Sequence, residues 1–153
     1  YQGGIIFYLD GNGGGLIAAP SDQSSGVAWG CYGTAIAGAN AYGIGYGAQN
    51  TIDILAGCSS SGIAAKLCDD YTVTSNGITY DDWFLPSKDE LDEMYNNKDA
   101  IGIPPGASGI SGNYYWSSSE SGMWDAWRQN LANGAQSMHE KSFSYYVRAV
   151  RAF

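Results

Sequence analysis

The sequence is poor in the side chains on which most catalytic and metal sites depend. Its 153 residues include one histidine, and charged residues make up 14% of the chain against roughly 25% in an average soluble domain. Seven basic residues are set against fifteen acidic ones, for a formal net charge of −8. This balance opposes non-specific binding to nucleic acid, anionic membranes and sulfated polysaccharides, which are all negatively charged.

Long hydrophobic runs are also missing. No apolar run approaches the roughly 20 residues that a membrane-spanning helix needs, so we expect no membrane insertion. The chain starts almost at once on a strand-like run, residues 4–9. From this abrupt start we expect a mature or excised part of a longer exported protein.

Three cysteines, Cys31, Cys58 and Cys68, fit no zinc pattern, because the chain has no CxxC motif and a single histidine. One disulfide and one free buried thiol are expected if the protein is exported. The pair Cys58 and Cys68 closes the shortest loop, and Cys31 with Cys58 is its main rival. The sequence leaves the pairing open.

Nucleophilic catalysis has little support in the sequence. A reactive cysteine or serine would need a nearby base, and His139 is the only histidine available. The run Ser117-Ser118-Ser119 lacks the surrounding GxSxG elbow of a hydrolase. We expect no catalytic residues, no cofactor and no metal ligands, while structural calcium at the four aspartates 69, 70, 81 and 82 remains an open question.

What the chain has in abundance is glycine, at 22 residues, and tyrosine, at 12. This composition favours short strands and ordered turns. Hairpins are predicted over residues 5–19 and 73–80, the second turning at Asn76-Gly77. Strands are further predicted over residues 114–119, 126–131, 135–139 and 146–152.

Helices are predicted in two regions. Asn50 can cap a helix over residues 51–56, and Ser61 can cap one over 62–68. Ser87 with Glu90 forms a capping box, before a helix that buries Leu91, Met94 and Tyr95. An irregular connection over residues 101–112 follows. The sequence therefore predicts a single α+β domain over residues 1–153.

The last forty residues combine strand-like runs with segments of antibody-like composition. Tyrosine and tryptophan offer large contact area at low entropic cost, while serine and glycine adapt around them. This mixture favours ligand binding over catalysis. The candidate binding residues lie within 121–146 and are Ser121, Met123, Trp124, Asp125, Arg128, Ala135, Ser137, His139, Glu140, Ser142, Phe143, Ser144, Tyr145 and Tyr146.

Some of the large side chains in this segment are expected to be structural. Trp116 and Trp127 are predicted to lie in the core, whereas Trp124 could be buried or exposed. Tyr145 and Tyr146 must point to opposite faces of a strand, so one should be buried and one available. Two arginines, at 148 and 151, are expected to make ion pairs with the acidic helix that begins after Ser87.

Three blocks carry a family resemblance. They are residues 4–20, the run Asp82-Trp-Phe-Leu-Pro-Ser-Lys-Asp-Glu-Leu91, and the closing motifs Tyr115-Trp-Ser-Ser-Ser-Glu120 and Val147-Arg-Ala-Val-Arg151. The chain resembles the C-terminal domain of the Legionella collagen-like adhesin family. The resemblance implies a C-type lectin-like fold, with two helical regions, small antiparallel sheets and long irregular loops, in an extracellular or cell-surface protein.

The lectin-like resemblance also brings enzymatic and sugar-binding relatives into view. Residues 83–87 and 147–151 are similar to the formylglycine-generating branch, whose enzymes need a pair of late cysteines. This chain has no cysteine after Cys68. It also lacks the Glu-Pro-Asn and Gln-Pro-Asp motifs of calcium-dependent lectins. Neither activity is therefore expected.

A second resemblance concerns residues 114–153, which look like the variable region of diversity-generating retroelement proteins. In such proteins a fixed framework separates positions that mutate at template adenines. The fixed positions here would be 115–120, 126, 127, 134, 141, 147, 148, 150 and 151. Seventeen candidate variable positions lie between them: Ser121, Gly122, Met123, Trp124, Asp125, Arg128, Ala132, Ala135, Ser137, Met138, His139, Glu140, Ser142, Phe143, Ser144, Tyr145 and Tyr146.

These observations lead to two hypotheses from different classes. The first is a non-catalytic surface recognition or adhesion domain. It would bind a protein or glycan ligand on another cell or surface, as part of a longer exported or phage-displayed protein. The alternative is a structural or trimerising cap, in which the exposed aromatics meet a second copy of the chain.

Overall fold

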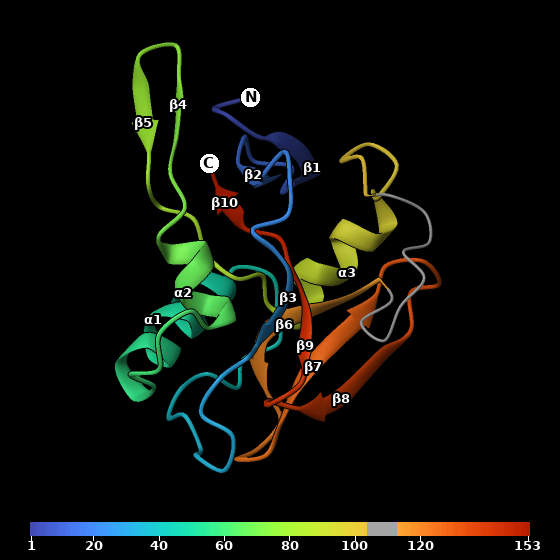
Figure 1. Ribbon diagram of the computed structural model, residues 1–153. Helices are drawn as coiled ribbons and strands as arrows, with labels where there is room; N and C mark the ends of the chain where they lie inside the picture. Colours follow the sequence, from blue (N-terminus) through green and yellow to red (C-terminus); the bar gives the residue numbers. More distant parts are fainter. Residues whose placement is uncertain (104–112) are drawn as a thin grey trace.

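The computed structural model describes residues 1–103 and 113–153, which fold as a small α+β domain (Figure 1). Three sheets and three helices occur among these residues. This confirms the predicted fold class, including helices in two regions of the sequence. The expected irregular connection after Ile101 falls mostly at residues 104–112, outside the described part of the chain.

The first sheet brings the two ends of the chain together. Strands β1 (Ile5–Leu9) and β2 (Gly15–Ala18) form the predicted hairpin, and β10 (Val150–Ala152) pairs with the free side of β2. The rings of Tyr1 and Phe153 lie 5.1 Å apart. Both termini therefore lie at the same end of the molecule (Figure 1).

A two-stranded hairpin projects at this same end (Figure 1). It consists of β4 (Val73–Ser75) and β5 (Ile78–Tyr80), as predicted. Asn76 and Gly77 have φ angles of 52° and 78°, the positive values that a tight hairpin turn requires. The prediction from the Asn-Gly pair is confirmed.

The largest sheet has the order β3-β9-β6-β7-β8. Its strands are β3 (Ser24–Ala28), β6 (Tyr114–Glu120), β7 (Asp125–Asn130), β8 (Gln136–Glu140) and β9 (Ser144–Val147). The pairing of β6 with β9 is parallel, so this sheet is mixed rather than purely antiparallel as expected. Strand β3 was not predicted.

The predicted strand over residues 146–152 is wrong in one respect. It divides into β9 and β10, which belong to different sheets. Between them the backbone of Ala149 donates to Gln23 Oε1 at 2.5 Å, and its carbonyl accepts from Ala19 at 2.9 Å. These bonds to the connection between β2 and β3 take the place of strand pairing at Ala149. The chain passes there from the large sheet to the sheet that contains β10.

Helices α1 (Gly47–Gly57) and α2 (Ala64–Asp69) start at other residues than predicted. Asn50 lies inside α1 and is fully buried, where its amide donates to Ala41 O at 2.7 Å and Ser118 Oγ at 3.3 Å. Ile63 occupies the N-cap position of α2 in place of Ser61. In both cases tertiary contacts outweigh the local capping preference.

Helix α3 (Lys88–Asn96) begins with the predicted capping box. Ser87 Oγ accepts from the Glu90 N–H at 3.3 Å, and Glu90 Oε2 accepts from the Ser87 N–H at 2.8 Å. Leu91 and Met94 are buried as expected, whereas Tyr95 is half-buried. Burial of Glu90 raises the pKa of its carboxyl.

The core holds one disulfide and one free thiol. Cys31 and Cys58 are joined, with Cα atoms 5.9 Å apart, which resolves the pairing that the sequence left open. Cys68 is free and fully buried, and this burial raises the pKa of its thiol. Cys68 belongs to a core cluster that also contains Trp29 and Trp116.

The two C-terminal arginines make ion pairs, but their partners are not on α3. Arg148 Nε lies 2.6 Å from Asp22 Oδ1, and its Nη1 donates to Ala19 O at 3.0 Å. Arg151 pairs with Asp82. Arg148 directly follows β9 and contacts the connection between β2 and β3, whereas Arg151 lies on β10. The expected pairing with the acidic helix is wrong.

Candidate functional site

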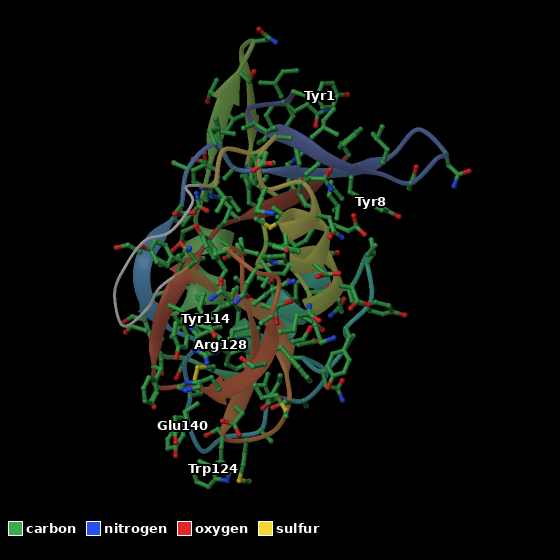
Figure 2. All side chains as sticks on the ribbon, turned by 90° about the vertical axis from the view of Figure 1, so that its right-hand side faces the viewer. Tyr1, Tyr8, Tyr114, Trp124, Arg128 and Glu140 are labelled. Atoms are coloured by element: carbon green, nitrogen blue, oxygen red, sulfur yellow. A yellow bond between two sulfur atoms is a disulfide. The ribbon has the colours of Figure 1, made fainter. Side chains whose placement is uncertain are left out.

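Part of the expected binding segment lies at the end of the domain opposite the termini. Figure 2 shows Trp124 and Glu140 at this end, and Tyr1 at the other. Three loops meet there, residues 31–35, 121–124 and 141–143, and are referred to below as the tip. The tip therefore lies at the opposite end of the domain from the chain's first residue.

The tip presents large apolar side chains to solvent. Trp124 is 49% exposed, Met123 44% and Tyr32 48%. The rings of Trp124 and Tyr32 lie 4.9 Å apart. Gly33, with a φ angle of 87°, lies under the indole, where a Cβ atom would come within 2.9 Å of the Trp124 ring. Gly33 also donates to Met123 O at 2.9 Å, so the two loops are held together.

A buried ion pair fixes the tip from inside. Lys141 Nζ lies 2.5 Å from Glu120 Oε1 and donates to Thr34 O at 2.9 Å. The two Glu120 oxygens accept from the Ile36 N–H, each at 3.0 Å. The Lys141 ammonium also lies 4.6 Å from the ring centre of Trp29. All three tip loops are therefore connected through one charged pair.

One face of the sheet beside the tip carries an aromatic cluster. Tyr145 packs against Trp116 at 4.8 Å and His139 at 5.5 Å between ring centres, and Phe143 lies 4.5 Å from His139. The Arg128 guanidinium lies 4.6 Å from the ring centre of Tyr145. These residues come from β6, β7, β8, β9 and the β8–β9 turn.

Tyr145 itself is buried, at 3% exposure. The sequence places Tyr145 and Tyr146 on opposite faces but does not indicate which is buried. Tyr145 shares a 3.0 Å hydrogen bond with His139 Nδ1. It therefore supports the surface from below and is not itself available to a ligand. Tyr146 is half-buried and stacks on Tyr115, with ring centres 5.1 Å apart.

Burial lowers the pKa of His139, and the positive charge of Arg128 lowers it further. A neutral imidazole at pH 7 suits the contact with the Tyr145 hydroxyl. Burial raises the pKa of Tyr145, which keeps the phenol protonated. This pair has the properties of a structural hydrogen bond.

The other expected site residues are solvent-accessible to different degrees. Those exposed are Met123, Trp124, Ala135, Glu140, Ser142, Phe143 and Ser144. Those half-buried are Ser121, Asp125, Arg128, Ser137 and His139. Ala135 lies at the far end of the β7–β8 hairpin from Trp124, so it does not join the others at the tip.

The prediction that Trp116 and Trp127 are both core residues is correct for the first and wrong for the second. Trp116 is fully buried and donates to Val27 O at 2.9 Å. Trp127 is half-buried on the opposite face, where Lys88 lies 4.8 Å from its ring centre and Tyr42 packs at 5.9 Å. Tyr42 and Lys88, the two residues that contact the Trp127 ring, lie far from the binding segment in sequence.

Tyr32 is the main surface residue that sequence reasoning missed. It stands outside residues 114–153, in a glycine- and alanine-rich stretch with no strand pattern. Its position beside Cys31 was the one available signal, since a disulfide can fix a loop.

The three serines considered as nucleophiles have structural roles. Ser117, Ser118 and Ser119 are fully buried. Ser117 Oγ donates to Trp127 O at 2.8 Å, and Ser119 Oγ donates to Ala41 O at 2.7 Å. Within residues 1–103 and 113–153 there is no cluster of three or more acidic, histidine or cysteine side chains placed to hold a metal.

Comparison with known proteins identifies the family. A sequence model of the Lcl C-terminal domain matches residues 20–151, most of the chain. No curated protein matches the chain. None of the helices described has the length and apolar character needed to cross a membrane. The family is adhesin-associated, which suggests a surface or exported protein. The chain belongs to the Lcl C-terminal domain family.

Proposed function

We propose that the domain is a non-catalytic recognition module that binds a macromolecular ligand through the tip and the adjoining outer surface of β7 and β8. The observation that carries this proposal is the exposure of Trp124, Met123 and Phe143 on a rigid frame. The three side chains are 44–49% exposed. Exposed aromatics that are already held in place lose little conformational entropy on binding.

The contact energy would be concentrated in a few side chains. Tryptophan and tyrosine dominate measured hot spots, where truncation to alanine costs 2 kcal/mol or more, by rough convention. Trp124 is the first candidate, because its ring contacts Tyr32 and about half of the side chain is exposed. Arg128 and Ser137 would supply polar contacts on one face of the β7–β8 pair, and Glu140 would supply them on the other.

The distribution of burial supports diversification of this segment by a retroelement. Eleven of the fourteen proposed framework positions are buried, and the other three, Trp127, Gly134 and Arg151, are half-buried. Sixteen of the seventeen proposed variable positions are exposed or half-buried, and the exception is Tyr145. Substitution at the exposed positions would change the surface without disturbing the packing.

Binding can be tested on arrays of extracellular proteins and glycans with the purified domain. We expect at least one ligand, and we expect W124A/F143A to weaken its binding ten-fold or more. The matched control is L9A/I78A, which truncates two exposed apolar side chains at the end of the molecule that carries the termini. Leu9 is 66% exposed and Ile78 is 56% exposed. Equal loss in both double variants, or loss in neither, would count against the tip as the binding surface.

The competing hypothesis is a structural cap that associates with itself. Sedimentation of the wild-type domain distinguishes the two. A stable trimer that dissociates on W124A would assign the exposed aromatics to a subunit interface. A monomer that binds an array ligand supports recognition.

Diversification has its own test. Sequencing the encoding gene's 3′ end across its source population should show substitutions concentrated in codons 121–146, traceable to adenines in a nearby template copy. An invariant sequence over these codons would contradict diversification by a retroelement and would leave a fixed adhesion domain or structural cap.

A further inference from the structure

The exposed surface at the tip extends beyond the segment that the sequence singled out. Tyr32 contributes a ring that is 48% exposed, in contact with Trp124 at 4.9 Å. Its loop is held by the Cys31–Cys58 disulfide and by hydrogen bonds that Gly30 and Gly33 donate to Lys141 O and Met123 O. Tyr32 is thus a fixed element beside residues proposed to vary.

Two carboxylates stand at the ends of β7 and β8 that adjoin the tip loops. Asp125 and Glu140 are direct partners across β7 and β8, so their side chains point to the same face. Asp125 follows Trp124 in sequence, and Glu140 precedes Lys141, whose N–H donates to Trp124 O at 2.9 Å. Figure 2 shows Glu140 at the same end of the molecule as Trp124.

Like charges directly opposite on neighbouring strands destabilise a sheet. Among the described residues, the ion pairs that form involve neither Asp125 nor Glu140. The nearest cations in sequence are already engaged: Lys141 is buried against Glu120, and Arg128 lies 3.8 Å from the ring centre of Tyr114. The tip and the adjoining ends of β7 and β8 therefore combine exposed aromatic rings with unneutralised negative charge.

We infer that Tyr32, Trp124, Asp125 and Glu140 form a docking surface for an arginine-bearing segment of a partner protein. This inference rests on the proposed recognition function and names its ligand class. A guanidinium can stack on an aromatic face while it donates to a carboxylate, and arginine does both better than lysine. The net charge of −8 would also accelerate the approach of a basic partner.

The probe for this inference is the peptide acetyl-(Gly-Arg)₃-amide, titrated into the isotope-labelled domain and followed by NMR. Its matched control is the same peptide with citrulline, which has nearly the shape of arginine but no charge. We expect the arginine peptide to shift the indole N–H of Trp124 and the amides of Tyr32, Asp125 and Glu140. The citrulline peptide should leave them in place.

Variants of the domain separate a specific site from general attraction. D125N/E140Q should reduce the response to the arginine peptide at least five-fold, and Y32A should reduce it as well. The control E93Q/D99N also removes one glutamate and one aspartate charge, but in the region of α3, and it should retain the response. Equal shifts with the citrulline peptide, no shift with either, or equal loss in the control variant would overturn the inference.

The recognition function can survive that failure. If an array ligand is lost on W124A/F143A but the arginine peptide does not bind, the tip recognises other chemistry. If the peptide binds as expected but no array ligand depends on the tip, the proposed recognition function fails while the cation-accepting surface remains.

Discussion

The ammonium group of Lys141 lies 2.5 Å from the carboxylate of Glu120, and both side chains are buried. These two residues directly flank residues 121–140, so the pair closes the base of most of the exposed segment. The same charges hold Thr34 and Ile36 in the neighbouring loop. This buried pair therefore connects the tip loops from inside, in addition to the backbone hydrogen bonds and the disulfide that hold them.

Lys141→Met should destabilise the domain strongly. Removing one member of a buried ion pair leaves an uncompensated charge and costs roughly 3–5 kcal/mol. Chemical denaturation measures the change in the free energy of unfolding. Lys66→Met is the control, since its pairs with Asp69 and Asp70 are exposed and should contribute little. Equal effects of the two substitutions would contradict a structural role for the buried pair.

The disulfide should add substantially to stability. It joins residues separated by 27 positions, and loop-closure entropy predicts a contribution of about 3–4 kcal/mol. The C31S/C58S variant should therefore melt well below the wild type and bind ligand less tightly, because the Tyr32 loop loses its anchor. An unchanged melting temperature would show that the bond is dispensable.

Thiol counting tests the cysteine assignment directly. The buried Cys68 thiol, whose pKa is raised, should not react with a thiol reagent in the native protein. We expect one reactive thiol per chain in denaturant without reductant, and three after reduction. A peptide map that joins Cys58 to Cys68 would contradict the pairing.

Tyr145 and Trp124 should respond to substitution in opposite ways. Tyr145→Ala empties a site in the core and should cost roughly 3–5 kcal/mol of stability. Trp124→Ala should change the melting temperature only slightly, because its ring is half exposed. Thermal unfolding of the two variants measures this difference. A larger loss on Trp124→Ala would place that ring in the core.

His139 should make stability depend on pH. Its pKa is lowered in the folded state, so the unfolded chain binds a proton first as pH falls. Stability from this residue is therefore present above the unfolded pKa of about 6.5 and declines as pH falls below it. The difference in melting temperature between wild type and His139→Gln should change between pH 7.5 and 5. A pH-independent difference would remove His139 as the cause.

The elements set by local chemistry could be predicted from the sequence. The Asn76-Gly77 turn and the Ser87–Glu90 capping box each need only a few neighbouring residues, and both form as expected. The alternation along β9 also correctly implied that one of Tyr145 and Tyr146 is buried. The sequence could not indicate which, because that depends on the strand's neighbours.

The features that could not be predicted from the sequence depend on contacts with distant parts of the chain. Strand β3 has serine, glycine and valine without clear alternation, and it forms because β9 offers a free edge. Asn50 is drawn into α1 by Ala41 and Ser118. Tyr32 reaches Trp124 only because the disulfide and the Gly33 turn place it there. No local pattern encodes such contacts.

Hydrogen exchange of the domain alone and with a partner recovered from the arrays tests the central claim most directly. The account predicts slower amide exchange on binding in residues 31–35, 121–124 and 140–143. Exchange in β1, β4 and β5, at the end of the termini, should be unchanged. Protection confined to that end, with none at the tip, would contradict recognition through this surface.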